Sequence, residues 1–131
     1  MFYLDGGNIY IHRGDSASFD IVFGDVDESE YDRNTVIAKD VYGIDWIPED
    51  GTPIRFTVKC DCGRMRPVIQ KDYVIWNGFV CIDLPTKDTR CLPYGTYQWD
   101  VRISFSDADT IDWNTPLNSF DFTVCEVVGD V

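Results

Sequence analysis

Residues 97–105 alternate between apolar and polar side chains without a break, and this pattern limits the possible folds more than any other stretch of the chain. One set of positions holds Tyr97, Trp99, Val101, Ile103 and Phe105. The positions between them hold Gln98, Asp100, Arg102 and Ser104. Because successive side chains of a β-strand point to opposite faces, this period of two predicts a strand with one buried face.

Similar runs recur along the chain, at 8–12, 19–23, 53–60, 67–76, 79–84 and 119–127. The pair Asn77-Gly78 between two of them is a strong signal for a tight turn. Helical periodicity is nearly absent, and the strand-helix spacing of a parallel sheet does not occur. We therefore predict an all-β fold with one domain over residues 1–131, namely an immunoglobulin-like antiparallel β-sandwich of about seven to nine short strands.

Residues 85–95 separate two of these runs, and their composition predicts a loop that crosses from one sheet to the other. Asp88 and Thr89 can hydrogen-bond to nearby backbone and hold a turn. Gly95 lets the backbone swing into the next strand. The residues expected to build this crossing are Asp88, Thr89, Leu92, Pro93, Gly95, Tyr97 and Trp99. Their role is predicted to be architectural rather than chemical, with Leu92 closing the bottom of the core.

The alternation disappears in residues 24–52, which we predict to form one long loop. Connections of this length in compact domains are often functional. The apolar residues of the loop could cover one end of the core, form a short helix or meet a partner, and Asp45, Trp46 and Ile47 could begin a short strand. We expect an interface here, because apolar side chains are isolated in an otherwise polar segment. The candidate interface residues are Tyr31, Tyr42, Ile44, Trp46 and Ile47.

The charge of the chain limits its partners. Eleven basic and 23 acidic residues give a net charge of −12. Nucleic acid and anionic membrane surfaces are therefore not expected as partners, because phosphate binding needs the opposite sign. No apolar run is long enough for a transmembrane helix. An acidic surface serves solubility, and it can also dock on a basic partner.

The cysteines indicate a reducing compartment. There are five of them. With no signal peptide recognisable in the sequence, an odd number favours free thiols and synthesis in a cytoplasm. Cys60 and Cys62 lack the spacing of a zinc or redox motif, and we interpret Cys60, Cys81 and Cys125 as small buried hydrophobic residues.

No catalytic motif stands out, and we predict no enzyme activity, no cofactor and no metal site. The single histidine, His12, lies in a short alternating run and is more typical of a surface position than of a catalyst. Asp107 and Asp109 could contact calcium, but the EF-hand spacing is absent. Paired carboxylates for glycoside hydrolysis stay open as an alternative, since acidic residues are plentiful and none of their spacings singles out a pair.

A resemblance extends over residues 9–126. The chain carries Gly14-Asp15 before a long strand, the strand motif Phe56–Lys59, and a crossing made of Asp88, Thr89, Leu92, Pro93, Gly95, Tyr97, Trp99 and Asp100. This order resembles the small β-sandwich domain at the amino terminus of phage baseplate upper proteins, which also occurs as short standalone proteins of phages and prophages. The resemblance implies a virion protein of the tail, baseplate or fibre that is made in the host cytoplasm and assembles with other virion proteins, often as a symmetric homo-oligomer. The segment 24–52 is longer and richer in aromatic residues than the corresponding segment of that phage domain.

A carbohydrate-binding module is the main alternative. Such modules are β-sandwiches whose exposed aromatic rings stack on sugars. Tyr42, Trp46, Trp76 and Trp113 are candidates, because each lies in or beside a loop. A cell-surface glycan is therefore a second possible partner.

Overall fold

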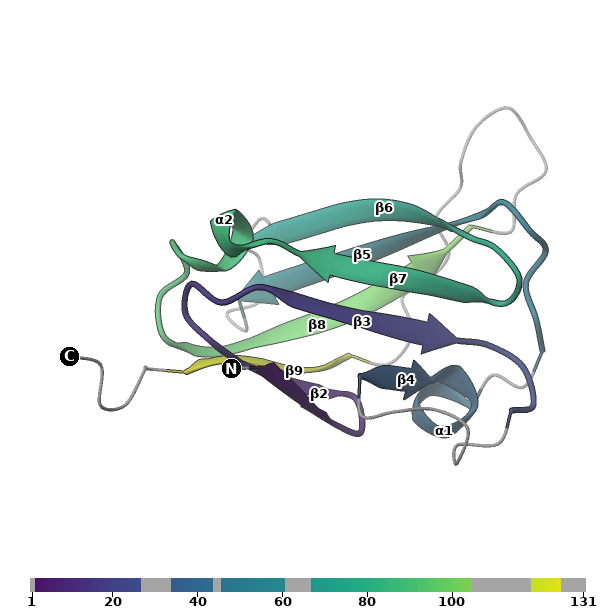
Figure 1. The fold of residues 1–131 in the computed structure, drawn as a ribbon, viewed down its shortest axis with the longest axis horizontal. Coiled ribbons are helices and arrows are strands. Elements are labelled where there is room, and N and C mark those ends of the chain that lie inside the picture. Colours follow the sequence, from purple (N-terminus) through teal and green to yellow (C-terminus); the bar gives the residue numbers. More distant parts are fainter. Residues whose placement is uncertain (1, 27–33, 44–45, 61–66, 105–118, 126–131) are drawn as a thin grey trace.

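The computed structural model describes residues 2–26, 34–43, 46–60, 67–104 and 119–125. Two β-sheets pack face to face, as Figure 1 shows. The larger sheet has the order β1 (Phe2–Asp5), β2 (Asn8–His12), β9 (Phe120–Cys125), β8 (Gly95–Ile103), β5 (Thr52–Cys60) and β6 (Ile69–Ile75). The smaller sheet has the order β4 (Thr35–Ile37), β3 (Ala17–Val22) and β7 (Phe79–Leu84). The prediction of an all-β sandwich is confirmed at this level.

The period-two pattern correctly identified the buried faces of β7 and β8. At the end of the predicted run it failed for Ser104, which is buried although it was placed on the polar face, and Phe105 lies outside the described residues. The inward side chains of β8 are Tyr97, Trp99, Val101 and Ile103, and all four are buried. The inward positions of β7, which are Val80, Ile82 and Leu84, are buried as well. Burial of such apolar faces contributes roughly 25 cal/mol for each Å² removed from water, which is the main term that holds the two sheets together.

Trp99 lies at the centre of this core. Its ring packs edge-on against Phe19 of β3, with ring centroids 6.0 Å apart, and lies 5.5 Å from the ring of Phe56 in β5. Its indole Nε1 donates a hydrogen bond of 2.8 Å to the carbonyl oxygen of Gly7 in the turn between β1 and β2. Trp99 therefore joins both sheets and the first hairpin.

The strand pairing differs from the prediction in one respect. Most neighbouring strands are antiparallel, but β2 pairs with β9 in parallel and β3 pairs with β4 in parallel. The alternation of side chains sets which face of a strand is buried, but it carries no information about the direction of the neighbouring strand.

The two sheets are connected along one side by the hairpin from β6 to β7. Asn77 and Gly78 both have positive φ, at 54° and 76°, which is the geometry of the predicted tight turn. The Tyr73 hydroxyl of β6 contacts both the N–H and the carbonyl oxygen of Asp83 in β7, at 3.3 Å each. The backbone N–H and carbonyl group of Asp83 therefore have a hydrogen-bond partner on β6.

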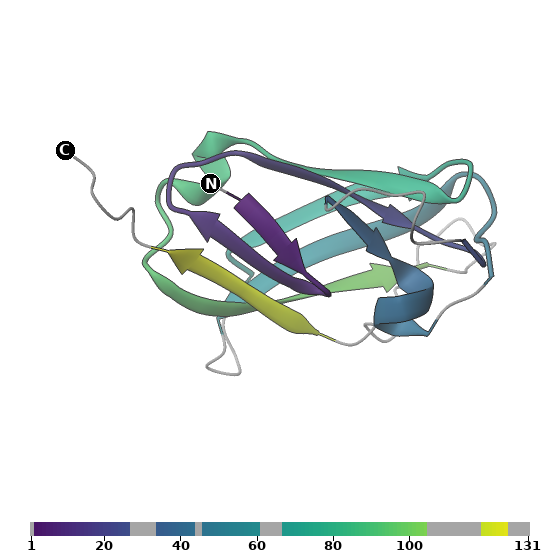
Figure 2. The same cartoon turned by 60° about the horizontal axis from the view of Figure 1, so that its bottom comes forward.

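The opposite side is covered by β1, a strand that the sequence analysis missed. The Phe2 ring of β1 stacks on Phe19 of β3 with centroids 6.1 Å apart. Figure 2 shows β1, in purple, lying over this side of the sandwich.

The prediction of one long loop at 24–52 was wrong. This segment contains β4 and the short helix α1 (Ala38–Tyr42), which ends at Gly43 in the left-handed conformation. The strand predicted to begin at Asp45, Trp46 and Ile47 is not observed at Trp46 or Ile47, and Asp45 lies outside the described residues. Val36 and Ala38 are fully buried, so the apolar residues of β4 and α1 cover one end of the core.

The cysteines also differ in part from the interpretation. Cys60 and Cys125 are half-buried, whereas Cys81 is exposed because it lies on the outer face of β7. Cys62 lies outside the described residues. In the part of the chain that the structure describes, no helix has the length and apolar character needed to cross a membrane.

Candidate protein interface

The crossing between β7 and β8 is an architectural element. It contains the short helix α2 (Thr86–Thr89), and Thr89 is completely buried within it. The Thr89 hydroxyl donates a hydrogen bond of 2.7 Å to the carbonyl oxygen of Asp15, which lies in the turn between β2 and β3. Leu92 is buried and joins the core cluster. These contacts fasten the crossing to the rest of the sandwich.

Other residues of the crossing take structural roles too. Asp88 forms an ion pair with Lys71 of β6 at 2.8 Å, and this hydrogen bond raises the pKa of Lys71. The Tyr97 hydroxyl donates a hydrogen bond of 2.8 Å to the carbonyl oxygen of Pro93. Gly95 has φ of 144°, a conformation that L side chains rarely adopt.

The predicted interface residues do not share one environment. Trp46 is 46% exposed and Ile47 is 63% exposed. Tyr42, at the end of α1, is partly buried, with its ring 6.4 Å from Trp99 and 5.8 Å from Phe120. Tyr42 therefore packs against the core, and its role in an interface stays a prediction. Tyr31 and Ile44 lie outside the described residues.

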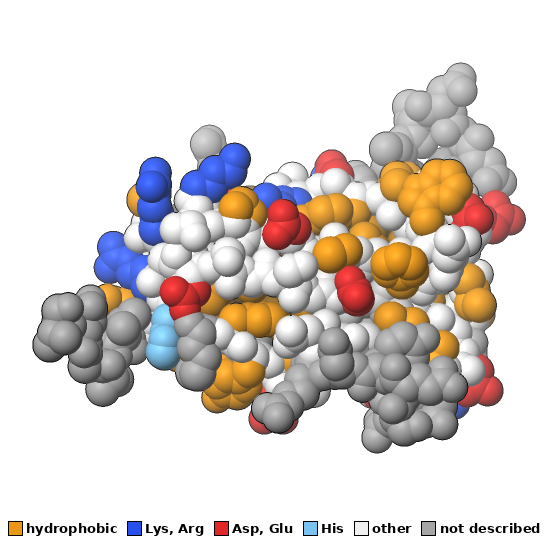
Figure 3. All heavy atoms as spheres, viewed as in Figure 1, with side chains coloured by type: hydrophobic (Ala, Val, Ile, Leu, Met, Phe, Trp, Pro, Cys, Tyr) orange, Lys and Arg blue, Asp and Glu red, His pale blue; other side chains and the backbone are white. Residues whose placement is uncertain are grey.

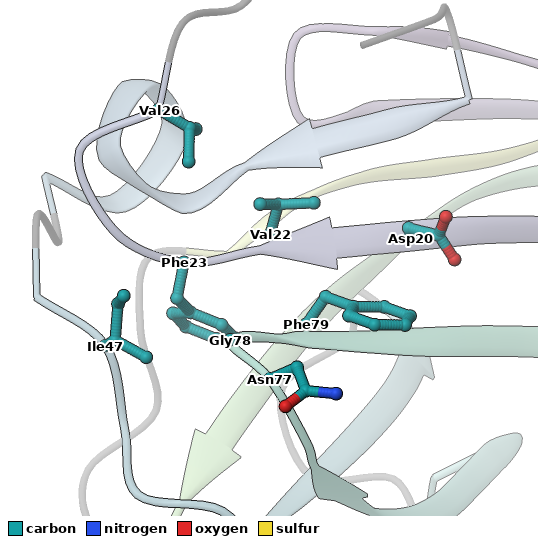
Figure 4. Close-up of a pocket in the computed structure, with 8 residues that line it drawn as sticks. All are labelled: Asp20, Val22, Phe23, Val26, Ile47, Asn77, Gly78 and Phe79. Atoms are coloured by element: carbon teal, nitrogen blue, oxygen red, sulfur yellow. The ribbon is translucent and has the colours of Figure 1, made fainter. Parts of the chain in front are cut away.

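Ile47 lies at the edge of a hollow in the surface, which we call the Ile47 hollow. Its volume is about 350 Å³. Figure 4 shows its lining, with Ile47 and Val26 on one side and Phe79 on the other. The lining residues are Asp20, Val22, Phe23, Val26, Ile47, Asn77, Gly78 and Phe79. Five of the eight are apolar, so the hollow is suited to an apolar side chain.

The backbone around the Ile47 hollow is held by close contacts. The Phe23 N–H donates to the carbonyl oxygen of Gly78 at 2.8 Å, which joins the end of β3 to the β6–β7 turn. A Cβ at Gly24 would lie 2.9 Å from the Ile47 side chain, and one at Gly78 would lie 3.3 Å from it. Ile47 therefore fits closely against two glycines.

Aromatic side chains extend this apolar surface. Trp76 and Phe79 lie directly opposite each other across the β6–β7 turn and are 54% and 44% exposed. Side chains of directly opposed residues lie side by side on one face. The Ile47 hollow therefore continues into an exposed aromatic pair.

Acidic groups surround the hollow. Asp20 belongs to its lining. The Asp50 carboxylate accepts a hydrogen bond of 2.8 Å from the Asn77 N–H, and Glu49 is exposed beside it. Asp25 is exposed and pairs with Lys39 of α1. The surface is thus an apolar hollow with a predominantly acidic rim.

Sequence reasoning identified Ile47 but missed Val26 and Phe79. Phe79 occupies an outward position of a run whose alternate residues Val80, Ile82 and Leu84 are buried. A large apolar residue on the outward face of an alternating strand was the signal that could have revealed it.

The hollow offers little for catalysis. Its lining holds one carboxylate and one side-chain amide, and no nucleophile beside a base. His12 lies at the end of β2, and β2 connects to β3 through a turn far from this lining. Among the residues that the structure describes, no group of three or more His, Cys, Asp or Glu side chains is arranged to hold a metal ion. Asp107, Asp109 and Trp113 lie outside the described residues.

Comparison of the chain with protein-family models, with curated proteins and with solved structures gave no match.

Proposed function

We propose that this protein is a non-enzymatic structural or adaptor component of a phage particle, in its tail, baseplate or fibre, and that it acts through protein–protein assembly. The observation that carries the proposal is the Ile47 hollow, an exposed apolar surface at the end of a well-packed sandwich. Ile47 at 63% exposure and Trp76 at 54% make this surface unusual. Contiguous apolar patches that face water are typical of interaction sites.

Burial of this surface would supply the free energy of assembly. Complete burial of a fully exposed apolar side chain contributes roughly 1.5–3 kcal/mol, and Ile47 and Phe79, which are 63% and 44% exposed, would each gain about half of that. Aromatic residues at the centre of an interface are frequently the ones that dominate binding. The Trp76–Phe79 pair beside Ile47 provides such a centre.

The architecture supports a finer assignment, an immunoglobulin-like topology. In such folds the second and fifth strands pair in one sheet, while the third, sixth and seventh form the other. In this chain β3 and β7 take the places of the second and fifth strands, and they pair with each other. The places of the third, sixth and seventh strands are taken by β5, β8 and β9, which are neighbours in the other sheet, with β6 added at the β5 edge. The Tyr97–Pro93 hydrogen bond has the geometry of a tyrosine corner, in which a tyrosine near the start of the sixth strand bonds to the backbone upstream.

Trp99 supports the same topology. Antibody domains have a disulfide that joins the second and sixth strands, and its second cysteine follows the corner tyrosine by two residues. Trp99 follows Tyr97 by two residues, and its ring contact with Phe19 joins β8 to β3. An aromatic contact thus takes the place of the disulfide, which suits a chain that folds in a reducing cytoplasm.

The proposed partners are other virion proteins and further copies of this chain. A net charge of −12 makes nucleic acid and membrane insertion unfavourable, so the packaged genome and the host membrane are not proposed as contacts. The apolar hollow instead favours a protein partner with a protruding apolar side chain.

The test is to purify phage particles from a host that carries this gene and to search them for the protein by mass spectrometry. We expect the wild-type chain in stoichiometric amounts and a strong loss of the Ile47→Asp variant. Tyr3→Asp is the matched control, because Tyr3 is 44% exposed on β1, away from the hollow. Absence of the wild-type chain from the particles contradicts the proposal.

Trp46 and Trp76 favour one alternative, a carbohydrate-binding module. Both are about half exposed, and exposed indole rings can stack on sugar rings. Titration with cell-wall glycans of the host, followed by tryptophan fluorescence, distinguishes the two functions. Saturable quenching that disappears in Trp76→Ala would favour the glycan, whereas an unchanged spectrum would favour the assembly role.

A further inference from the structure

The two ends of the sandwich have opposite chemical character. The paths of β3 and β7 show which turns and helices lie at the same end of the sandwich. β3 begins beside the β2–β3 turn and ends at Val22, in the lining of the Ile47 hollow, whereas β7 begins at Phe79, in the same lining, and ends next to α2. The β2–β3 turn and α2 therefore lie at one end of the sandwich, and the hollow lies at the other.

Cations gather at the α2 end. Arg13 Nε donates a hydrogen bond of 2.9 Å to the carbonyl oxygen of Arg90, and the Arg13 guanidinium lies 5.2 Å above the ring of Tyr94. Lys87, in α2, is exposed, as are Arg13 and Arg90. Figure 3 shows the blue side chains concentrated on this end of the molecule. We call Arg13, Lys87, Arg90 and Tyr94 the basic end.

Tyr94 gives the basic end an apolar contact group. Its side chain is 50% exposed although it belongs to a loop that is otherwise fastened to the core. The neighbouring Thr89 hydroxyl bonds to the Asp15 backbone, and the Tyr97 hydroxyl bonds to the Pro93 backbone. An aromatic ring flanked by cations thus stands on a supported loop.

The opposite end of the sandwich is complementary to the basic end in charge and in its apolar surface. The Ile47 hollow is open and apolar, and Asp25, Glu49 and Asp50 are exposed around it. Lys39 of α1 is paired with Asp25 beside the hollow. A Tyr94 side chain matches the hollow in polarity, while the cations beside it match the carboxylates of the rim.

We propose that the protein associates head to tail, with the basic end of one copy docked on the Ile47 hollow of the next copy. This inference rests on the proposed function and names its partner as a second copy of the chain. A chain of net charge −12 repels its own copies in most orientations, and the contact between basic and acidic ends is the orientation in which charges attract. A contact between two different surfaces of the same chain is heterologous, so it generates a closed ring or a filament.

Sedimentation velocity tests the proposal with two charge reversals. In the first variant Lys87→Glu and Arg90→Glu make both ends acidic. In the second, Asp25→Lys and Glu49→Lys make both ends basic. All four positions are exposed, so each variant is expected to keep its fold, which circular dichroism checks. Lys87→Glu alone is the milder variant, should the double change impair folding.

At about 50 mM salt we expect the wild type to form assemblies that dissociate towards 15.0 kDa monomers at about 1 M salt. Each reversal alone is expected to be monomeric at low salt, because like charges then meet. An equimolar mixture of the two variants is expected to associate again, because the acidic ends of one meet the basic ends of the other.

Three results would overturn the head-to-tail contact. They are a monomeric wild type at low salt, a variant with Lys87→Glu and Arg90→Glu that associates like the wild type, and a mixture of the two variants that stays monomeric. Failure of this contact is separable from failure of the proposed function. If both reversals enter particles normally while Ile47→Asp is excluded, the hollow binds a different virion protein and the head-to-tail contact is wrong.

Discussion

The Tyr97 hydroxyl donates a hydrogen bond of 2.8 Å to the carbonyl oxygen of Pro93, four residues earlier in the chain. Tyr97 is buried, whereas Pro93 is exposed. The bond thus fixes an exposed loop to a buried strand, at the point where the chain leaves the crossing and enters β8. The same loop carries Tyr94, so its position affects the basic end directly.

Tyr97→Phe should reduce the free energy of unfolding by about 1 kcal/mol, the usual net contribution of one hydrogen bond. The effect stays modest because the Pro93 carbonyl can bind water once the hydroxyl is gone. Thermal unfolding followed by circular dichroism measures the change. An unchanged melting temperature would mean that this hydrogen bond makes no net contribution to stability.

Tyr42→Phe should stabilise the protein by up to about 1 kcal/mol, because it removes a buried hydroxyl that has no hydrogen-bond partner among the residues that the structure describes. The ring keeps its contacts with Trp99 and Phe120. Chemical unfolding of both proteins near neutral pH measures the difference. A loss of stability in the variant would reveal a bond from the hydroxyl to water or to another part of the chain.

The same residue predicts a pH dependence. Burial, and secondarily the charge of Asp100, raises the pKa of Tyr42 above the usual value of about 10. The folded state therefore favours the neutral hydroxyl. The stability linked to it is complete below pH 10 and falls as the pH rises further. We expect wild-type stability to decline above about pH 10 more steeply than that of Tyr42→Phe, and equal slopes would contradict this.

Asp100→Asn should raise stability at neutral pH. Burial raises the pKa of Asp100, against the opposing effect of Lys59 and Arg102, and within the described part of the chain one carboxylate oxygen is buried without a hydrogen-bond partner. Since the raised pKa favours the protonated acid, ionised Asp100 lowers stability as the pH rises from about 3.9 through its folded pKa. The gain in melting temperature should therefore disappear in acid.

Asp72→Asn is the control for this substitution. The Asp72 carboxylate accepts two hydrogen bonds from Arg55, at 2.7 and 3.1 Å, so its loss should weaken the protein slightly. If Asp100→Asn behaved like Asp72→Asn at neutral pH, the unfavourable burial of Asp100 would be refuted.

Much of the fold could be predicted because burial follows local alternation. The strands β8 and β7 are examples, since each has one apolar face and one polar face. The strand β1 was missed because four residues are too few for a clear period. The parallel pairs β2–β9 and β3–β4 could not be predicted, because the partner of a strand is decided by distant parts of the chain.

The candidate interface could be predicted only in part. Ile47 and Tyr42 are both apolar residues in a polar segment, and the sequence does not distinguish them. The short helix α1 turns Tyr42 towards the core, whereas Ile47 lies outside any helix or strand, against Gly24 and Gly78. Phe79 reaches the same hollow from β7, a proximity that only the three-dimensional fold creates.

The most direct test of the central claim, self-association through the Ile47 hollow, is the solution mass by light scattering on a sizing column, at two protein concentrations. We predict that the wild-type mass exceeds the 15.0 kDa of one chain and rises with concentration, whereas Ile47→Asp stays at 15.0 kDa and Tyr3→Asp behaves like the wild type. A wild type that stays at 15.0 kDa at both concentrations, or an Ile47→Asp variant with the wild-type mass, would contradict the claim.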